Sequence, residues 1–124
     1  MEQFVGTLGF KSVKIMSPQA HDEIISFTSQ LPHAIAVALI NSDNEKYDTG
    51  KYIGDSYRDL TRIANINEDL WSELFLRNRE NLLKSIEAFE LQLALIKQGL
   101  VENDEQILKK LFISSSKRRE KLEK

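Results

Sequence analysis

The chain has 124 residues, of which 41% are hydrophobic and 29% are charged, and its formal net charge is −2. This length fits one domain, or one part of a larger protein, with enough apolar residues for a core. The small net charge creates no global field that would attract nucleic acid or a membrane surface. Because the sequence has no cysteine, it excludes disulfides and thiolate metal sites.

The first sixteen residues differ in pattern from the rest. Residues 2–9 are typical of a helix end with Gly9 as its stop, and residues 10–15 alternate like a strand. A lone strand leaves its backbone groups unpaired, so residues 1–16 are expected to be the trailing edge of an α/β unit. We find no signal peptide, and the longest apolar run, residues 34–40, is too short to span a membrane. We therefore expect a cytoplasmic protein.

The next segment predicts a long helix that is interrupted by a proline. Ser17 is suited to the N-cap and Pro18 to the first helical position, and the apolar pattern continues to about Ile40. Because Pro32 removes a backbone hydrogen bond and crowds the carbonyl one turn earlier, we expect a kink or break near residues 30–33. Beyond it the helix is apolar on every face, which predicts burial on all sides and hence a second subunit.

The remaining chain predicts a loop and three further helices. Residues 41–49 are polar and rich in asparagine and aspartate, and a short helix is expected over residues 56–64. Asn67 is a suitable N-cap for a long helix over residues 68–98, with Gly99 at its end. Its apolar positions are spaced by three and four and include Trp71, Leu74, Phe75, Leu82, Ile86, Phe89, Leu93 and Ile96. A last helix from residue 103 or 104 to Leu122 completes an all-α fold.

Two arginines give the strongest chemical signal. Arg58 and Arg62 are spaced to share one helix face, and Asp59 is placed to orient Arg62. An arginine that is oriented by a neighbouring carboxylate can bind the carboxylate of a substrate through two parallel hydrogen bonds. The alternative is a solvated helix whose ion pairs have no function.

The histidines and the basic tail give weaker signals. His33 follows the expected helix break, where an imidazole could donate to a substrate oxygen, although a core histidine is the commoner case. His33 and His21 with no cysteine make no convincing metal site. The basic residues near the C-terminus suit a solvated helix end, so we expect no nucleic acid partner.

Four stretches together resemble the C-terminal helical domain of the prephenate dehydrogenase family: residues 16–22, 29–36, 57–64 and 67–71. The order and approximate spacing match from about residue 8 to the end of the chain. The resemblance implies a helical dimerisation and substrate-binding domain over residues 17–124, acting in a homodimer. It also implies oxidative decarboxylation of prephenate to 4-hydroxyphenylpyruvate by the parent enzyme, in tyrosine biosynthesis.

The resemblance also implies roles for particular residues. Arg62 matches an arginine that binds a prephenate carboxylate, with Asp59 beside it. His33 matches a histidine of the substrate pocket, and Gln30 stands where many members carry a second histidine. Trp71 lies in the apolar stripe, where a core or interface residue is the commoner case, and it also matches a tryptophan near the active site of the family. Gly54 remains from a run of glycines that many relatives show before this motif, and a turn with positive φ is expected there.

The sequence has no Gly-x-Gly-x-x-Gly motif after a strand. In this family that motif and the catalytic histidine belong to an N-terminal Rossmann-like domain. We therefore expect residues 1–16 to be a remnant of that domain, NAD to bind only in the parent, and this chain alone to hold no catalytic residue and no activity. Three alternatives are an arogenate dehydrogenase, the helical domain of another related dehydrogenase, and a stand-alone dimerisation or adaptor module.

Overall fold

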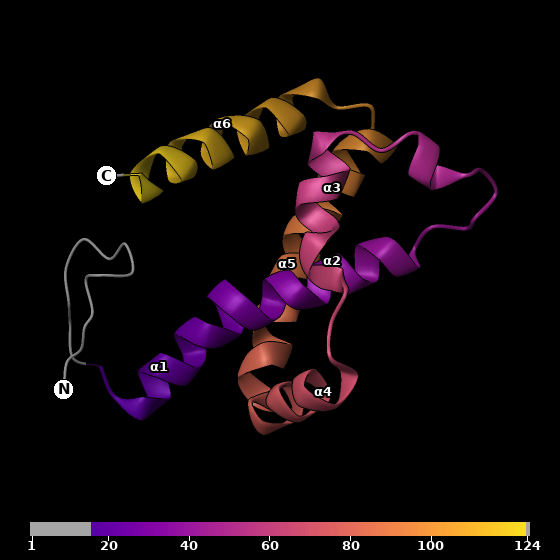
Figure 1. Ribbon diagram of the computed structural model, residues 1–124. Helices are drawn as coiled ribbons and strands as arrows, with labels where there is room; N and C mark the ends of the chain where they lie inside the picture. Colours follow the sequence, from indigo (N-terminus) through magenta and orange to yellow (C-terminus); the bar gives the residue numbers. More distant parts are fainter. Residues whose placement is uncertain (1–15, 124) are drawn as a thin grey trace. The chain divides into compact units, whose positions relative to one another are not determined.

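The computed structural model describes residues 16–123, and every regular element within that range is helical (Figure 1). The prediction of an all-α fold is confirmed. The expected helix end and strand at the N-terminus lie outside the described residues, apart from Met16, so the remnant stays a prediction. The chain forms two compact units, the first ending at Ser85 and the second beginning at Ile86. The boundary lies inside a helix, and each unit is described by itself below.

The first unit opens with the predicted long helix, which consists of α1 (Pro18–Ile25), η2 (Ser26–Gln30) and α2 (Leu31–Asn41) (Figure 1). Its start is as expected, because the Ser17 hydroxyl accepts a hydrogen bond from the Ala20 N–H at 3.1 Å. Pro18 occupies the first helical position, where a missing N–H costs nothing.

Pro32 is accommodated without a break. The turn before it, η2, is a π-helix, and the Leu31 N–H closes this wider turn on the Ser26 carbonyl. The π turn shifts the register so that Pro32 falls in the first turn of α2, where proline is tolerated. The predicted irregularity is therefore present, but it lies just upstream of the expected place and the helix continues through it.

The helix from Pro18 to Asn41 is much longer than the uninterrupted apolar run that it contains, and it is apolar on average over most of its length. Its 24 residues reach a mean hydropathy of 1.3 over their most apolar window, which is enough by length and composition to cross a membrane. The sequence expectation concerned the uninterrupted apolar run, residues 34–40, and length and composition alone are weak evidence for a membrane span. The core helix of a globular protein meets the same measures, and two polar side chains of this helix, Ser26 and Gln30, are buried.

Burial of α2 is incomplete in one copy of the chain. Ala36 is fully buried, whereas Ile40 is 41% exposed. The sequence predicts that a second subunit completes the enclosure of this helix, and that partner stays a prediction.

A polar loop, the short helix η3 (Thr49–Lys51), α3 (Asp55–Thr61) and η4 (Arg62–Ala64) follow, and both α3 and η4 pack against α2. The predicted short helix is present, although its last turn tightens to a 3₁₀-helix at Arg62. Gly54 precedes it with φ −105°, so the expected turn with positive φ is absent at this residue.

The predicted long helix from Asn67 is two helices. Asn67 is the N-cap, as expected, and accepts from the Leu70 N–H at 2.9 Å. However, α4 (Glu68–Arg77) ends at Asn78, whose φ −113° and ψ 31° are not helical, and α5 (Arg79–Val101) begins after it. The apolar stripe continues across this break, which is why the sequence pattern does not reveal it. Among the described residues, the buried apolar side chains are Leu31, Ala36 and Leu82.

In the second unit, α5 runs through Gly99 rather than ending there. The end is marked by Asn103, which has φ 52°, and by hydrogen bonds from the Asp104 N–H to the Gly99 carbonyl and from the Asn103 N–H to the Leu100 carbonyl. This pattern is a Schellman motif, in which asparagine takes the left-handed position. Asp104 then caps the predicted last helix, α6 (Glu105–Leu122).

Candidate functional site

Two of the predicted site residues contact each other directly. The rings of His33, in the first turn of α2, and Trp71, in the first turn of α4, are stacked with centroids 3.9 Å apart and an interplanar angle of 20°. Phe75, one turn along α4, meets the Trp71 ring edge-on at 6.1 Å. Both stacked side chains are partly exposed. This pair forms an aromatic surface with one titratable member.

The hydrogen bonding of His33 defines its neutral tautomer. The ring Nδ1 lies 2.8 Å from the Ser29 carbonyl oxygen. Because a carbonyl oxygen can only accept, Nδ1 must carry the hydrogen, and Nε2 of the neutral ring is then an acceptor. Within residues 16–123 no hydrogen bond involves Nε2. His33 therefore offers one ring nitrogen for a ligand while the other fixes the ring orientation.

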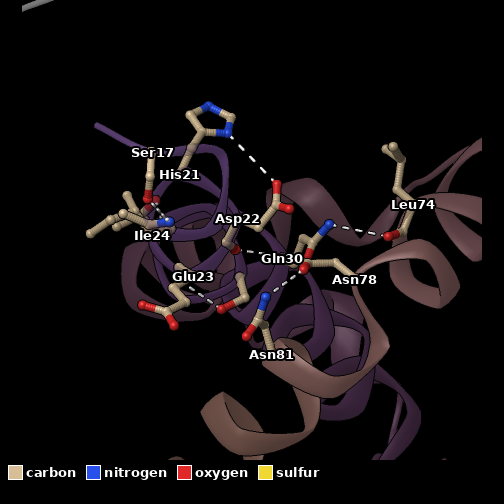
Figure 2. Close-up of polar contacts among 12 residues, drawn as sticks. Ser17, His21, Asp22, Glu23, Ile24, Gln30, Leu74, Asn78 and Asn81 are labelled. Atoms are coloured by element: carbon tan, nitrogen blue, oxygen red, sulfur yellow. Dashed lines mark hydrogen bonds and ion pairs between the residues drawn. The ribbon is translucent and has the colours of Figure 1, made fainter. Parts of the chain in front are cut away.

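Gln30 is held in the protein rather than presented at the surface. Its side chain is 5% exposed, its Nε2 donates to the Leu74 carbonyl at 3.2 Å, and its Oε1 accepts from Asn78 Nδ2 at 2.9 Å (Figure 2). Both ends of the amide are thus paired inside the first unit. Each end keeps one further hydrogen-bonding position, but burial of the residue keeps the amide from direct contact with a substrate.

Sequence reasoning missed Asn78, which is the centre of this polar cluster. Its Nδ2 also donates to the Asp22 carbonyl at 2.9 Å, and its Oδ1 accepts from Asn81 Nδ2 at 2.9 Å (Figure 2). A separate hydrogen bond joins the hydroxyls of Ser26 and Ser85 at 3.0 Å. The available signal was an asparagine, a poor helix former, in the middle of a long apolar stripe.

Arg62 and Asp59 pair with each other at the surface. Arg62 Nη1 lies 3.8 Å from Asp59 Oδ1, and the two side chains are 73% and 67% exposed. Arg58 pairs instead with Asp55, at 3.5 Å. The two arginines lie on different elements, since Arg58 is in α3 and Arg62 opens η4. Each therefore has its own carboxylate partner, and both guanidinium groups remain accessible.

The structure thus groups the predicted site residues into three contacts on one unit: His33 with Trp71, Asp59 with Arg62, and Gln30 with the α4–α5 junction. The first two are linked by packing, because η4 lies against α2. In the described part of the chain, no three His, Cys, Asp or Glu side chains gather in a way that could hold a metal ion.

Comparison with known proteins identifies the family. The family model for the dimerization domain of prephenate dehydrogenase matches residues 17–114. The chain belongs to the prephenate dehydrogenase family. The match covers the helical elements that carry all of the candidate site residues.

Curated relatives agree with this family. The chain is 33% identical over 112 residues to a cyclohexadienyl dehydrogenase from Zymomonas mobilis, covering 86% of this chain and 38% of the relative. It is 30% identical over 113 residues to a prephenate dehydrogenase from Lactococcus lactis, covering 88% of this chain and 32% of the relative. The chain thus spans well under half the length of the relatives that it matches.

Solved structures show the same helical fold. A prephenate dehydrogenase from A. aeolicus in complex with hydroxyphenyl propionate and NAD+ has a TM-score of 0.73 and 38% identity, covering 88% of this chain and 40% of that one. An arogenate dehydrogenase from Synechocystis has a TM-score of 0.81 over 90% of this chain and 42% of that one, but at 22% identity it shows the fold alone.

Proposed function

We propose that this chain is the dimerisation and substrate-binding part of an NAD-dependent prephenate dehydrogenase. The parent reaction would be the oxidative decarboxylation of prephenate to 4-hydroxyphenylpyruvate in tyrosine biosynthesis. The observation that carries the proposal is the stacked pair of His33 and Trp71, because the helix that carries His33 also packs against the element that carries Arg62. An aromatic surface and an accessible guanidinium suit a cyclic acid that carries carboxylates.

Each residue then has a distinct task. Arg62 anchors a substrate carboxylate through a charge-assisted fork, and Asp59 orients the guanidinium. Trp71 and His33 form a wall against which the ring of the substrate lies, and Nε2 of the neutral His33 ring accepts a hydrogen bond there. These tasks are binding and orientation, so a base and a hydride acceptor must come from elsewhere in the parent enzyme.

NAD, when bound by the parent, accepts the hydride. Within the described helices the residues do not form a glycine-rich turn between a strand and a helix, which is the usual cradle for a dinucleotide pyrophosphate. We therefore propose that a nucleotide-binding domain holds NAD and that this chain alone is inactive. We further propose a cytoplasmic homodimer that binds neither a membrane nor nucleic acid.

The test is an assay of the complete gene product. The open reading frame upstream of the Met1 codon should encode a Gly-x-Gly-x-x-Gly motif after a strand, and the product should form NADH from prephenate. Activity with arogenate in place of prephenate would assign the other substrate to the same domain. If the reading frame encodes no such motif and the product reduces NAD with neither substrate, the chain is a stand-alone dimerisation module and the proposal is wrong.

A further inference from the structure

We propose that Asn78, acting through Gln30, is a positioning residue that sets the contact between His33 and Trp71. The proposal rests on the proposed function only in taking that pair as part of the substrate site. It concerns the geometry of one compact unit, since all four residues precede Ser85.

The register of the two helical segments connects these residues. Gln30 bonds to the Leu74 carbonyl, and one turn along each segment His33 stacks on Trp71. The two segments are antiparallel here, because Gln30 to His33 runs up the sequence while Leu74 to Trp71 runs down it. The hydrogen bond and the stack are therefore successive contacts of one interface, so a shift at the first moves the second.

The amide orientations in this interface are fixed by backbone carbonyls. Gln30 must direct its NH₂ group at the Leu74 carbonyl, because that oxygen can only accept, and this leaves its Oε1 toward Asn78. Asn78 must direct its own NH₂ group at both Oε1 and the Asp22 carbonyl. A flip of either amide would therefore place oxygen against oxygen, and the cluster has one satisfied arrangement.

The backbone at Asn78 adds a second constraint. Asn78 is the non-helical residue between α4 and α5, so it fixes where α4 ends. Its side chain also donates a hydrogen bond to the Asp22 carbonyl in α1. The end of α4 that carries Leu74 is thereby tied to η2 and α1. An arrangement of this kind holds an aromatic pair within the tolerance that a binding site needs.

Tryptophan fluorescence of the 124-residue chain provides the test, because Trp71 is its only tryptophan. In the unmodified chain, His33→Ala should change the emission and acrylamide quenching of Trp71, since the stack is lost. Asn78→Asp removes the donor but keeps the shape of the side chain. In this background the change in Trp71 emission and quenching caused by His33→Ala should be less than about half of the change in the unmodified chain. The matched control is Ser85→Ala, which breaks the Ser26 contact in the same unit and leaves the amides intact.

The proposal predicts a full His33→Ala response in the Ser85→Ala background. A full response in the Asn78→Asp background as well would overturn it, because the stack would then persist without the amide cluster. Asn78→Ser, whose single hydroxyl hydrogen cannot replace both hydrogen bonds of the amide, serves as the second variant if Asn78→Asp does not fold, and the same reduced response is expected. Loss of folding in both variants, with Ser85→Ala folded, would also overturn the proposal in favour of a purely structural role.

A second experiment separates the failure of this proposal from the failure of the proposed function. Calorimetric titration of the complete gene product with hydroxyphenyl propionate, in the presence of NAD, should show binding, and Asn78→Asp should weaken this binding by about tenfold if the pair is displaced. If the compound does not bind to the unmodified protein while the Trp71 signal of the chain still depends on Asn78, the substrate assignment fails and the positioning role stands.

Discussion

The imidazole of His33 lies face to face with the indole of Trp71, at a centroid distance of 3.9 Å. A stacked aromatic pair contributes about 0.5–1.5 kcal/mol beyond the area that it buries. His33→Phe should keep most of this contribution, whereas His33→Leu should lose about 1 kcal/mol of unfolding free energy. Both variants should impair catalysis by the parent enzyme, because neither offers a ring nitrogen. Denaturant titration checks the first expectation, and equal loss in both variants would contradict it.

Arg62→Ala in the complete dehydrogenase should raise KM for prephenate far more than it changes the affinity for NAD. Loss of a charge-assisted hydrogen bond costs about 1.5–3 kcal/mol, or roughly ten- to a hundredfold in binding. Arg62→Lys should recover only part of this, because an ammonium cannot make the bidentate contact. Steady-state kinetics with each substrate varied provides the measurement.

Arg58→Ala is the matched control for Arg62→Ala. It removes the same charge from a similarly exposed arginine that also has an aspartate partner. Its effect on KM should be the smaller of the two. A larger effect would assign the carboxylate anchor to Arg58, and no effect from either would make both pairs ordinary surface ion pairs.

Sedimentation of the purified chain should give about twice its mass of 14.3 kDa. The reason is the number of large apolar side chains that one copy leaves exposed on its helices, among them Phe27, Leu60, Leu76, Leu91, Leu93 and Phe112. An obligate dimer interface covers large apolar side chains of this kind. A monomer at micromolar concentration would refute this expectation.

Gly99→Ala should destabilise the second unit. A methyl group built at Gly99 would lie 3.0 Å from Leu108 Cδ2 and 3.3 Å from Ile107 Cγ2. Overpacking of this kind costs about 1–3 kcal/mol, which exceeds the helix preference for alanine of about 1 kcal/mol. At Gly54 a methyl group would meet no atom within 4 Å and φ is negative, so Gly54→Ala should be neutral or slightly stabilising. Thermal melts of the two variants compare them directly.

Asp43 should titrate below its ordinary pKa of 3.8, because the Thr49 hydroxyl and then the Glu45 N–H donate to its carboxylate. Because the pKa of Asp43 is lower in the folded state, ionised Asp43 stabilises the loop at pH values above the ordinary pKa. This stabilisation is lost as the pH falls through the pKa of the folded state. Thr49→Val should raise the pKa of Asp43 toward 3.8. Thr61→Val, which removes a hydroxyl bonded to the Tyr57 carbonyl, should leave it unchanged. Carboxyl NMR signals measured against pH report both.

Local side-chain chemistry accounts for the features that the sequence predicts well. Ser17 and Asn67 cap helices where expected, because an N-cap depends on one side chain and the nearest backbone N–H groups. The last helix also begins near the expected residue, with Asp104 as its N-cap. The disturbance caused by Pro32 is predictable for the same reason. Its form is not, since a π turn and a kink both relieve the same clash.

Tertiary contacts account for the features that the sequence does not predict. Asn78 ends α4 because partners distant in sequence, Gln30 and the Asp22 carbonyl, hold its side chain. Gly99 looks like a helix stop, but it is needed inside α5 for the close approach of Leu108, and Asn103 takes the left-handed position. At the candidate site, the contact of His33 with Trp71 depends on the same long-range packing and has no signature in residue spacing.

Because the described residues of one copy bury so few apolar side chains, we expect folding of this domain to be coupled to its association. Its melting temperature would then rise with protein concentration, as mass action requires when only the assembled form is stable. A substitution far from the substrate site could lower activity at low expression and leave it normal at high expression. Loss-of-function variants of the parent enzyme should therefore be sorted first by whether added protein rescues them, before any residue is assigned to chemistry.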